Sequence, residues 1–173
     1  MAKKRLLVEQ YLISKLAKKR ISLGKTKFQK LMYLLTVKKI VDVPDYQLYH
    51  FGPYSSIVDF DLTYLNHKGV VQIEWVDYGS GYYGYKILPK DVRDTDVRGI
   101  DTNAIDRIIN DFGELTTKEL SILATAIYLY EQDKSKNRET LVDEVYKLKP
   151  NYSKEEIRDI LDKYFNDYLT LSF

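Results

Sequence analysis

Cysteine is absent from the 173-residue chain, and histidine occurs only twice. Without cysteine the chain can form no disulfide, no thiolate nucleophile and no zinc site with sulfur ligands. The two histidines, His50 and His67, are not at the helical spacing of a metal-binding pair. The carboxylates are scattered and form no recognisable catalytic pair. We therefore expect no metal, no cofactor and no catalytic residue in a protein that is not an enzyme.

Long apolar runs are also missing. No segment approaches the roughly 20 apolar residues that cross a membrane. The basic start, Met-Ala-Lys-Lys-Arg, leads into an amphipathic stretch rather than the apolar block of a signal peptide. These features predict a cytoplasmic protein without a membrane partner. Hydrophobic residues make up 45% of the chain, which is enough for a folded core.

Negative charge is scarce in the first forty residues. They contain twelve Lys or Arg and one acidic residue, Glu9, which gives a net charge of +11. The whole chain has 27 basic and 25 acidic residues. Beyond residue 40 there are therefore 15 basic and 24 acidic residues, which gives this remainder a net charge of −9. A basic segment joined to an acidic one predicts a nucleic-acid surface on one side of the molecule. The alternative is that these lysines only solvate two amphipathic helices.

Hydrophobic periodicity predicts a mostly α-helical α+β protein. We expect helices over 3–19 and 26–40, a short strand over 46–51, a turn at Gly52 and Pro53, and a third helix from Ser55 or Ser56 to His67. A β-hairpin follows over 70–76 and 82–88. Further helices are expected over 102–112, 117–131, 138–148 and 154–168, the second and fourth of these beginning with capping boxes.

This order of elements is that of a winged helix, in which the third helix enters the major groove of DNA and the hairpin is the wing. The sequence therefore predicts a winged-helix-like domain over residues 1–90. The polar, aperiodic segment 91–99 is interpreted as a linker. A small helical subdomain is expected over residues 100–173.

Basic and aromatic side chains supply the candidate nucleic-acid contacts. Lys27, Lys30 and Lys38 fall within about 80° of each other on a helical wheel, so they could follow one row of phosphates. Tyr83 and Tyr85 share one face of the predicted hairpin and Lys86 lies on the other. The predicted nucleic-acid-binding residues are Lys18, Lys19, Arg20, Lys25, Lys27, Lys30, Lys38, Ser55, Ser56, Thr63, Asn66, Tyr83, Tyr85 and Lys86.

The third helix also carries an argument against direct DNA contact. It contains Asp59 and Asp61, which point about 160° apart on a helix. A carboxylate that faces DNA is unfavourable unless it accepts a hydrogen bond from cytosine.

Three stretches together resemble a known family: GKTKFQKLMYLL at 24–35, YHFGPYSSIVDFDLTYLNHKGVV at 49–71 and KLKPNYSKEEI at 147–157. They resemble the YwgA-like proteins, described as predicted transcriptional regulators. More distantly they are similar to the Panacea (SocA-like) antitoxin domain, which also pairs a KLQKLLY-type helix with a later GP turn. Here Leu-Tyr-His-Phe precedes the GP, where that domain has a Trp or Lys. The resemblance implies a winged-helix-like core and a helical tail, and it supplies no functional residues.

These observations favour a DNA-binding transcriptional regulator with double-stranded DNA as its partner. The acidic helical half would then contact a protein partner or form a homodimer. The alternative is an antitoxin-type interaction module that binds and neutralises a toxin. An enzyme of unknown chemistry, an RNA-binding role and a purely structural role stay open as further alternatives.

Overall fold

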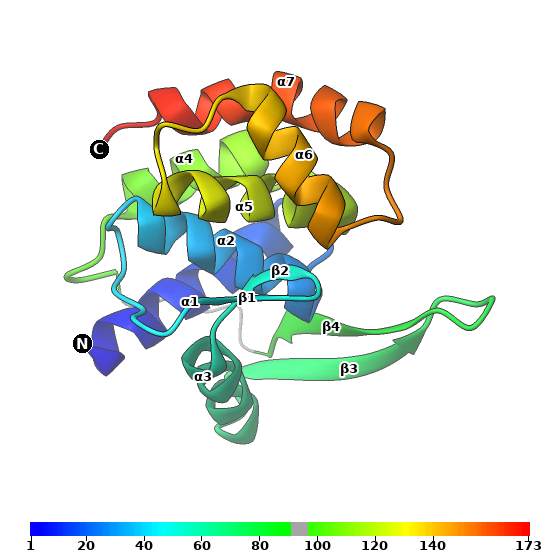
Figure 1. Ribbon diagram of the computed structural model, residues 1–173. Coiled ribbons are helices and arrows are strands. Elements are labelled where there is room, and N and C mark those ends of the chain that lie inside the picture. Colours follow the sequence, from blue (N-terminus) through cyan, green and yellow to red (C-terminus); the bar gives the residue numbers. More distant parts are fainter. Residues whose placement is uncertain (91–96) are drawn as a thin grey trace.

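The computed structural model describes residues 1–90 and 97–173, and within them the chain forms a mostly helical α+β fold (Figure 1). This confirms the predicted class. The predicted linker falls mainly on residues 91–96, which lie outside the described residues. The elements are α1 (Ala2–Lys18), α2 (Lys25–Val37), β1 (Gln47–Tyr49), β2 (Gly52–Tyr54), α3 (Ser56–His67), β3 (Val71–Asp77), β4 (Tyr83–Pro89), α4 (Thr102–Phe112), α5 (Thr117–Gln132), α6 (Arg138–Leu148) and α7 (Lys154–Thr170).

Helix α2 lies in the middle of the molecule. Figure 1 shows α4 and α5 above it, with α6 and α7 higher still, and α3 with the β3–β4 hairpin below. Phe28 and Leu31 of α2 are fully buried and belong to the same apolar cluster as Ile108 of α4 and Leu123 of α5. One core therefore contains residues from both the N-terminal and the C-terminal half of the chain. Helix α2 is central because apolar side chains occupy most of its circumference.

Several helices begin with a side-chain cap at the residue that the sequence predicts. The Ser55 hydroxyl accepts a hydrogen bond from the backbone N–H of Val58 at the start of α3. Both predicted capping boxes are confirmed, at Thr116 with Glu119 and at Ser153 with Glu156. Each cap satisfies an N–H group that has no partner within its own helix.

The segment around Gly52 and Pro53 differs from the prediction. The expected single strand over 46–51 is a two-stranded hairpin, in which Gln47–Tyr49 pairs with Gly52–Tyr54. Gly52 and Pro53 therefore belong to a strand, and the turn lies at His50 and Phe51. Gly52 adopts φ +99°, a left-handed value that glycine tolerates and other residues rarely adopt, so the chain can leave the turn directly into β2.

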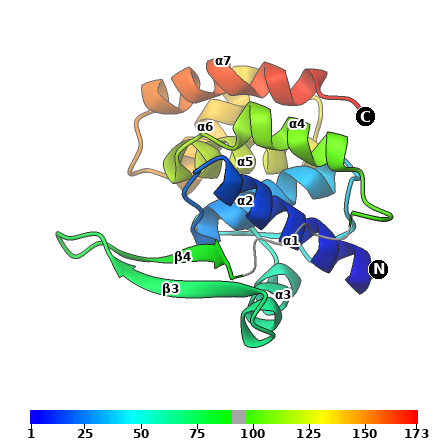
Figure 2. The same ribbon diagram turned by 180° about the vertical axis from the view of Figure 1, so that it is seen from behind.

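The β3–β4 hairpin matches its prediction closely. Its register places Trp75 opposite Tyr85 and Asp77 opposite Tyr83. The segment between α1 and α2 pairs with the other edge of β4, where the N–H of Ile87 donates to the carbonyl oxygen of Leu23 over 2.8 Å. Seen from behind, the hairpin projects away from the helical body with α3 at its base (Figure 2).

Candidate nucleic-acid interface

A groove of about 790 Å³ lies between the hairpin and the α1–α2 loop. Its basic residues are Lys19, Arg20, Lys25 and Lys27, and its aromatic residues include Tyr82 and Tyr83. Lys19 and Arg20 are exposed, as is Lys18 beside them. The structure thus brings two residues of the predicted Lys-Lys-Arg run, Lys19 and Arg20, and one predicted hairpin tyrosine to the same groove. Glu114 is the one acidic residue among those that line it.

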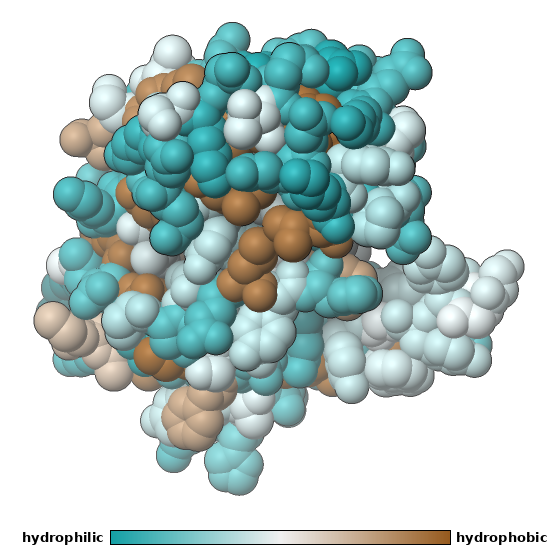
Figure 3. Space-filling view, in the orientation of Figure 1, coloured by the Kyte–Doolittle hydropathy of each residue, from teal (hydrophilic) through white to brown (hydrophobic). Residues whose placement is uncertain are grey.

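The hairpin adds an aromatic surface that the sequence only partly indicated. Tyr83 and Tyr85 share one face, as predicted, and both rings contact Trp75, with centroids 5.5 and 4.9 Å away. Tyr82 is the most exposed of the hairpin tyrosines, at 77%. In the space-filling view the projecting hairpin is pale, because Tyr, Trp and Gly are nearly neutral in hydropathy (Figure 3). Such rings can stack on sugars or donate hydrogen bonds to phosphates.

Lys25 connects three elements at the edge of this groove. Its ammonium nitrogen lies 3.6 Å from a carboxylate oxygen of Asp59 in α3 and 4.6 Å from the ring centroid of Tyr85 in β4. The positive charge thus lies between α3 and the hairpin and offsets the charge of Asp59.

The exposed face of α3 includes one partly exposed carboxylate, Asp59, whose side chain is 39% exposed and lies beside Lys25. Ser56, Phe60, Thr63 and His67 are exposed and follow one another at the spacing of a single helix face. The face offers hydroxyl and imidazole groups for hydrogen bonds and an aromatic ring for apolar contact. Asp61 is buried, and Lys25 partly offsets the charge of Asp59, so the acidic residues of α3 oppose DNA contact less than the sequence indicated.

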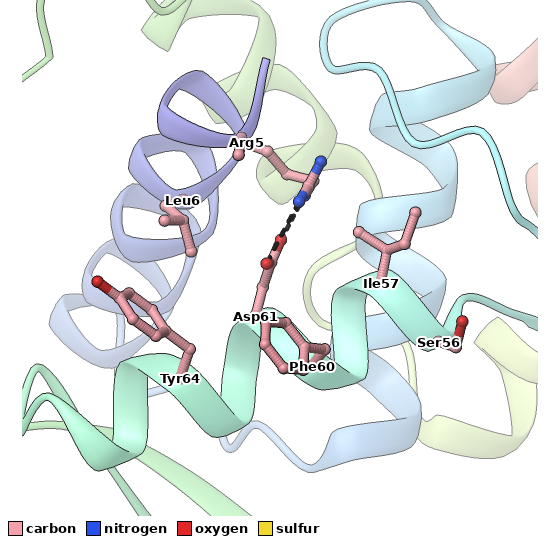
Figure 4. A pocket seen from close by; sticks show the side chains of 8 residues that line it. Arg5, Leu6, Ser56, Ile57, Phe60, Asp61 and Tyr64 are labelled. Carbon is pink, nitrogen blue, oxygen red and sulfur yellow. Dashed lines mark hydrogen bonds and ion pairs between the residues drawn. The ribbon is translucent and has the colours of Figure 1, made fainter.

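Helix α3 is attached to α1 by a buried ion pair. The Arg5 guanidinium donates two hydrogen bonds to the Asp61 carboxylate, and Figure 4 shows the two side chains meeting across the space between the helices. Glu9, one turn along α1, is fully buried, and neither of its carboxylate oxygens has a hydrogen-bond partner among the described residues. Burial, and then the negative charge of Asp61, raise the pKa of Glu9 to about 9.

Three of the predicted DNA-binding lysines are not freely exposed, although Lys27 borders the groove. Lys27 and Lys30 are buried, and Lys38 points toward the end of α7, where it donates to the carbonyl oxygen of Leu171 over 2.9 Å. Burial lowers the pKa of all three side chains. The prediction of one charged face along α2 is therefore wrong. The helix is packed on nearly all sides, so a position beside the apolar stripe is still inside the protein.

The remaining predicted residues have mixed positions. Ser55 is fully buried as the cap of α3, so its prediction as a DNA contact is wrong. Ser56 and Thr63 are exposed, although their hydroxyls donate to Asp45 and to the backbone of Asp59. The side-chain oxygen of Asn66 accepts a hydrogen bond from the N–H of Ile73 and so joins α3 to β3. Lys86 is half-buried, and it lies opposite Glu74 on the face of the hairpin away from Tyr83 and Tyr85.

The β1–β2 turn is held by side chains from distant parts of the chain. Lys149 donates a hydrogen bond to the carbonyl oxygen of His50 over 3.1 Å, and Ser121 donates to that of Phe51 over 2.5 Å. Lys30 donates to the carbonyl oxygen of Pro53 over 2.9 Å. Lys30, the turn and Lys149 come from the three stretches that carry the family resemblance. The stretches are therefore in contact in space although they lie far apart in the sequence.

Sequence reasoning missed Glu9, Phe60, Trp75 and Tyr82 as features of this region. A signal existed for Glu9, because it lies three, four and seven residues before Leu12, Ile13 and Leu16 and so belongs to the buried stripe of α1. For Trp75 the signal was strand alternation, which places it on the same face as Val71 and Ile73. It lies directly opposite Tyr85 in the hairpin.

Among the described residues, no group of three or more His, Asp or Glu side chains is placed to bind a metal ion. None of the helices in the same residues is both long and apolar enough to span a membrane. No protein-family model matches the chain, and no curated protein is significantly similar to it. The YwgA-like and Panacea resemblance thus stays a prediction.

Proposed function

We propose that the chain binds double-stranded DNA through a winged-helix-like unit formed by residues 1–90, and that it acts as a non-enzymatic transcriptional regulator. Helix α3 would enter the major groove, and the β3–β4 hairpin would be the wing. The pairing of Leu23 and Gly24 with β4 supports this arrangement, because it joins the α1–α2 loop to the hairpin through a β-bridge.

The observation that carries the proposal is the groove beside the hairpin. Lys19, Arg20 and Lys25 line it together with exposed tyrosines, so basic and aromatic groups face the same space. Cationic side chains supply most of the affinity for phosphates, and aromatic hydroxyls add short-range contacts. The exposed face of α3 lies at the base of the same hairpin.

Binding to a fluorescently labelled random-sequence duplex, measured by anisotropy at low salt, tests the proposal. Replacing Tyr82 and Tyr83 together with Ala should weaken binding by about 0.5–1.5 kcal/mol for each lost hydrogen bond to phosphate, with little change in salt dependence. Tyr146→Ala, on α6, is the matched control and should leave binding unchanged. If the unaltered protein shows no duplex binding at low salt, the proposal fails.

A second candidate, the antitoxin-type module, is favoured by one other feature. A cleft of about 590 Å³ between α1 and α3 is lined by Leu6, Ile57, Phe60 and Tyr64, as well as by the Arg5–Asp61 pair (Figure 4). Phe60 is 70% exposed. An apolar cleft with an exposed aromatic ring suits a protein partner. If Phe60→Ala abolishes binding of a co-expressed partner protein and duplex binding is absent, this candidate takes first place.

The acidic C-terminal half was expected to contact a protein partner or a second copy. Several of its carboxylates form ion pairs within the chain, including Glu156 with Lys118, Asp162 with Arg138 and Asp143 with Lys154. These pairs reduce the charge that a basic partner would meet, so the interface that we propose for a protein partner is the α1–α3 cleft.

A further inference from the structure

A pocket of about 440 Å³ lies between the first turns of α2 and the β1–β2 hairpin. The hairpin side contributes the aromatic residues Tyr49, Phe51 and Tyr54, and the rings of Tyr49 and Tyr54 are in edge-to-face contact with centroids 5.3 Å apart. The helix side contributes Lys25, Thr26, Gln29 and Lys30. The pocket therefore has aromatic residues on one side and two lysines on the other.

Lys30 is an unusual residue to find at such a site. Its side chain is 2% exposed, and of its three N–H groups the structure pairs one, with the carbonyl oxygen of Pro53. Lys149 is also buried behind the turn and donates to His50 and Ser121. Neither lysine forms an ion pair with a carboxylate among the described residues. Buried cations without a counter-ion are unfavourable, and such groups are concentrated at functional sites.

We propose that this pocket binds a small molecule with a flat apolar body and a single carboxylate. The carboxylate would accept hydrogen bonds from Lys30, and from Lys25 at the rim, while the flat body would lie against the rings of Tyr49 and Tyr54. Asp59 also lines the pocket, and its negative charge disfavours a ligand with a second anionic group. This pocket shares Lys25, Thr26 and Phe51 with the groove of the proposed DNA interface, but the binding of its ligand does not depend on DNA binding.

The first test compares benzoate with benzamide, which has the same shape and no charge. Amide chemical shifts of the full chain are followed by NMR at pH 6, where the Lys30 amine is protonated, during titration with each compound. Benzoate should shift the amide signals of Thr26, of residues 49–52 and of Tyr54, and benzamide should bind about tenfold more weakly or worse, because a charge-assisted contact is lost. No shift with benzoate, or equal affinity for both compounds, overturns the proposal.

The second test replaces Lys30 with Met, which keeps the length of the side chain and removes the charge. Lys30→Met should weaken benzoate binding by about tenfold and leave benzamide binding unchanged. Lys147→Met, at an exposed position of α6, is the control and should bind benzoate as the unaltered protein does. Equal benzoate affinity in both variants contradicts the proposal. If Lys30→Met does not fold, the comparison of benzoate with benzamide on the unaltered protein still decides.

Discussion

The ammonium nitrogen of Lys30 lies 2.9 Å from the carbonyl oxygen of Pro53, so this lysine supports the β1–β2 hairpin from inside the protein. Burial, reinforced by the positive charge of Lys149, lowers the pKa of Lys30 from 10.5 to about 7. Between these values the unfolded chain binds more protons at this residue than the folded chain. The contribution of Lys30 to stability therefore rises with pH through this window.

Replacement of Lys30 by Met tests this linkage. The free energy of unfolding of the unaltered protein, relative to that of Lys30→Met, should increase by up to about 1.4 kcal/mol per pH unit between about pH 7 and pH 10. Urea denaturation at a series of pH values measures both proteins. A difference that is constant across this range would show that the Lys30 pKa is not lowered.

Gly52 should be far less replaceable than Gly81. Both have positive φ, but a Cβ at Gly52 would lie 2.7 Å from the Thr125 hydroxyl and 3.3 Å from the Ser121 carbonyl oxygen, whereas Gly81 has open space around it. Gly81→Ala should cost about 1–2 kcal/mol for its backbone conformation alone. Gly52→Ala should cost at least about 1 kcal/mol more, because packed atoms must also move. Thermal or urea denaturation compares the two, and equal losses would contradict the close packing of β2 on α5.

The two serines before α3 should differ in the same kind of measurement. The buried Ser55 hydroxyl accepts from the N–H of Val58 and donates to Asp45, whereas Ser56 is exposed. Ser55→Ala should reduce stability by about 1–2 kcal/mol, and Ser56→Ala by less than about 0.5 kcal/mol. The reverse order would mean that Ser56 is the cap.

The sequence was informative where local rules decide the structure. The hairpin strands, the helix caps at Thr116 and Ser153, and the four helices after residue 100 all follow from periodicity and capping patterns. The β1–β2 hairpin was missed because its strands are three residues long, and because its turn is supported by Lys30, Ser121 and Lys149 from distant parts of the chain. Such long-range contacts leave no local pattern.

The candidate interface was predictable only in part, for a related reason. A helical wheel gives the direction of a side chain but not what lies in that direction. Lys19, Arg20 and Tyr83 are near a chain turn or the tip of a hairpin and line the groove as expected. Lys27 and Lys30 are buried instead, because both faces of α2 are covered by other parts of the chain.

Glu9 should reduce stability at neutral pH. Its pKa is about 9 in the folded chain, against an ordinary value of 4.5 that applies to the unfolded chain. The folded chain therefore binds more protons at this residue and loses stability as pH rises between these values. Glu9→Gln imitates the protonated form, and its stability advantage should grow by up to about 1.4 kcal/mol per pH unit across that window. Parallel stability–pH curves for the two proteins would show that the Glu9 carboxyl titrates normally.

The most direct test of DNA binding through the groove is the salt dependence of duplex affinity. Each phosphate contact that a cation makes contributes about −0.9 to the slope of log affinity against log salt concentration. Replacing both Lys19 and Arg20 with Gln should make the slope shallower by about two and weaken binding equally for all duplex sequences. The control replaces Lys147 and Lys163, which are exposed on α6 and α7, with Gln and makes the same change in net charge. This control should leave the slope unchanged. Equal slopes for both double variants would contradict DNA binding through the groove.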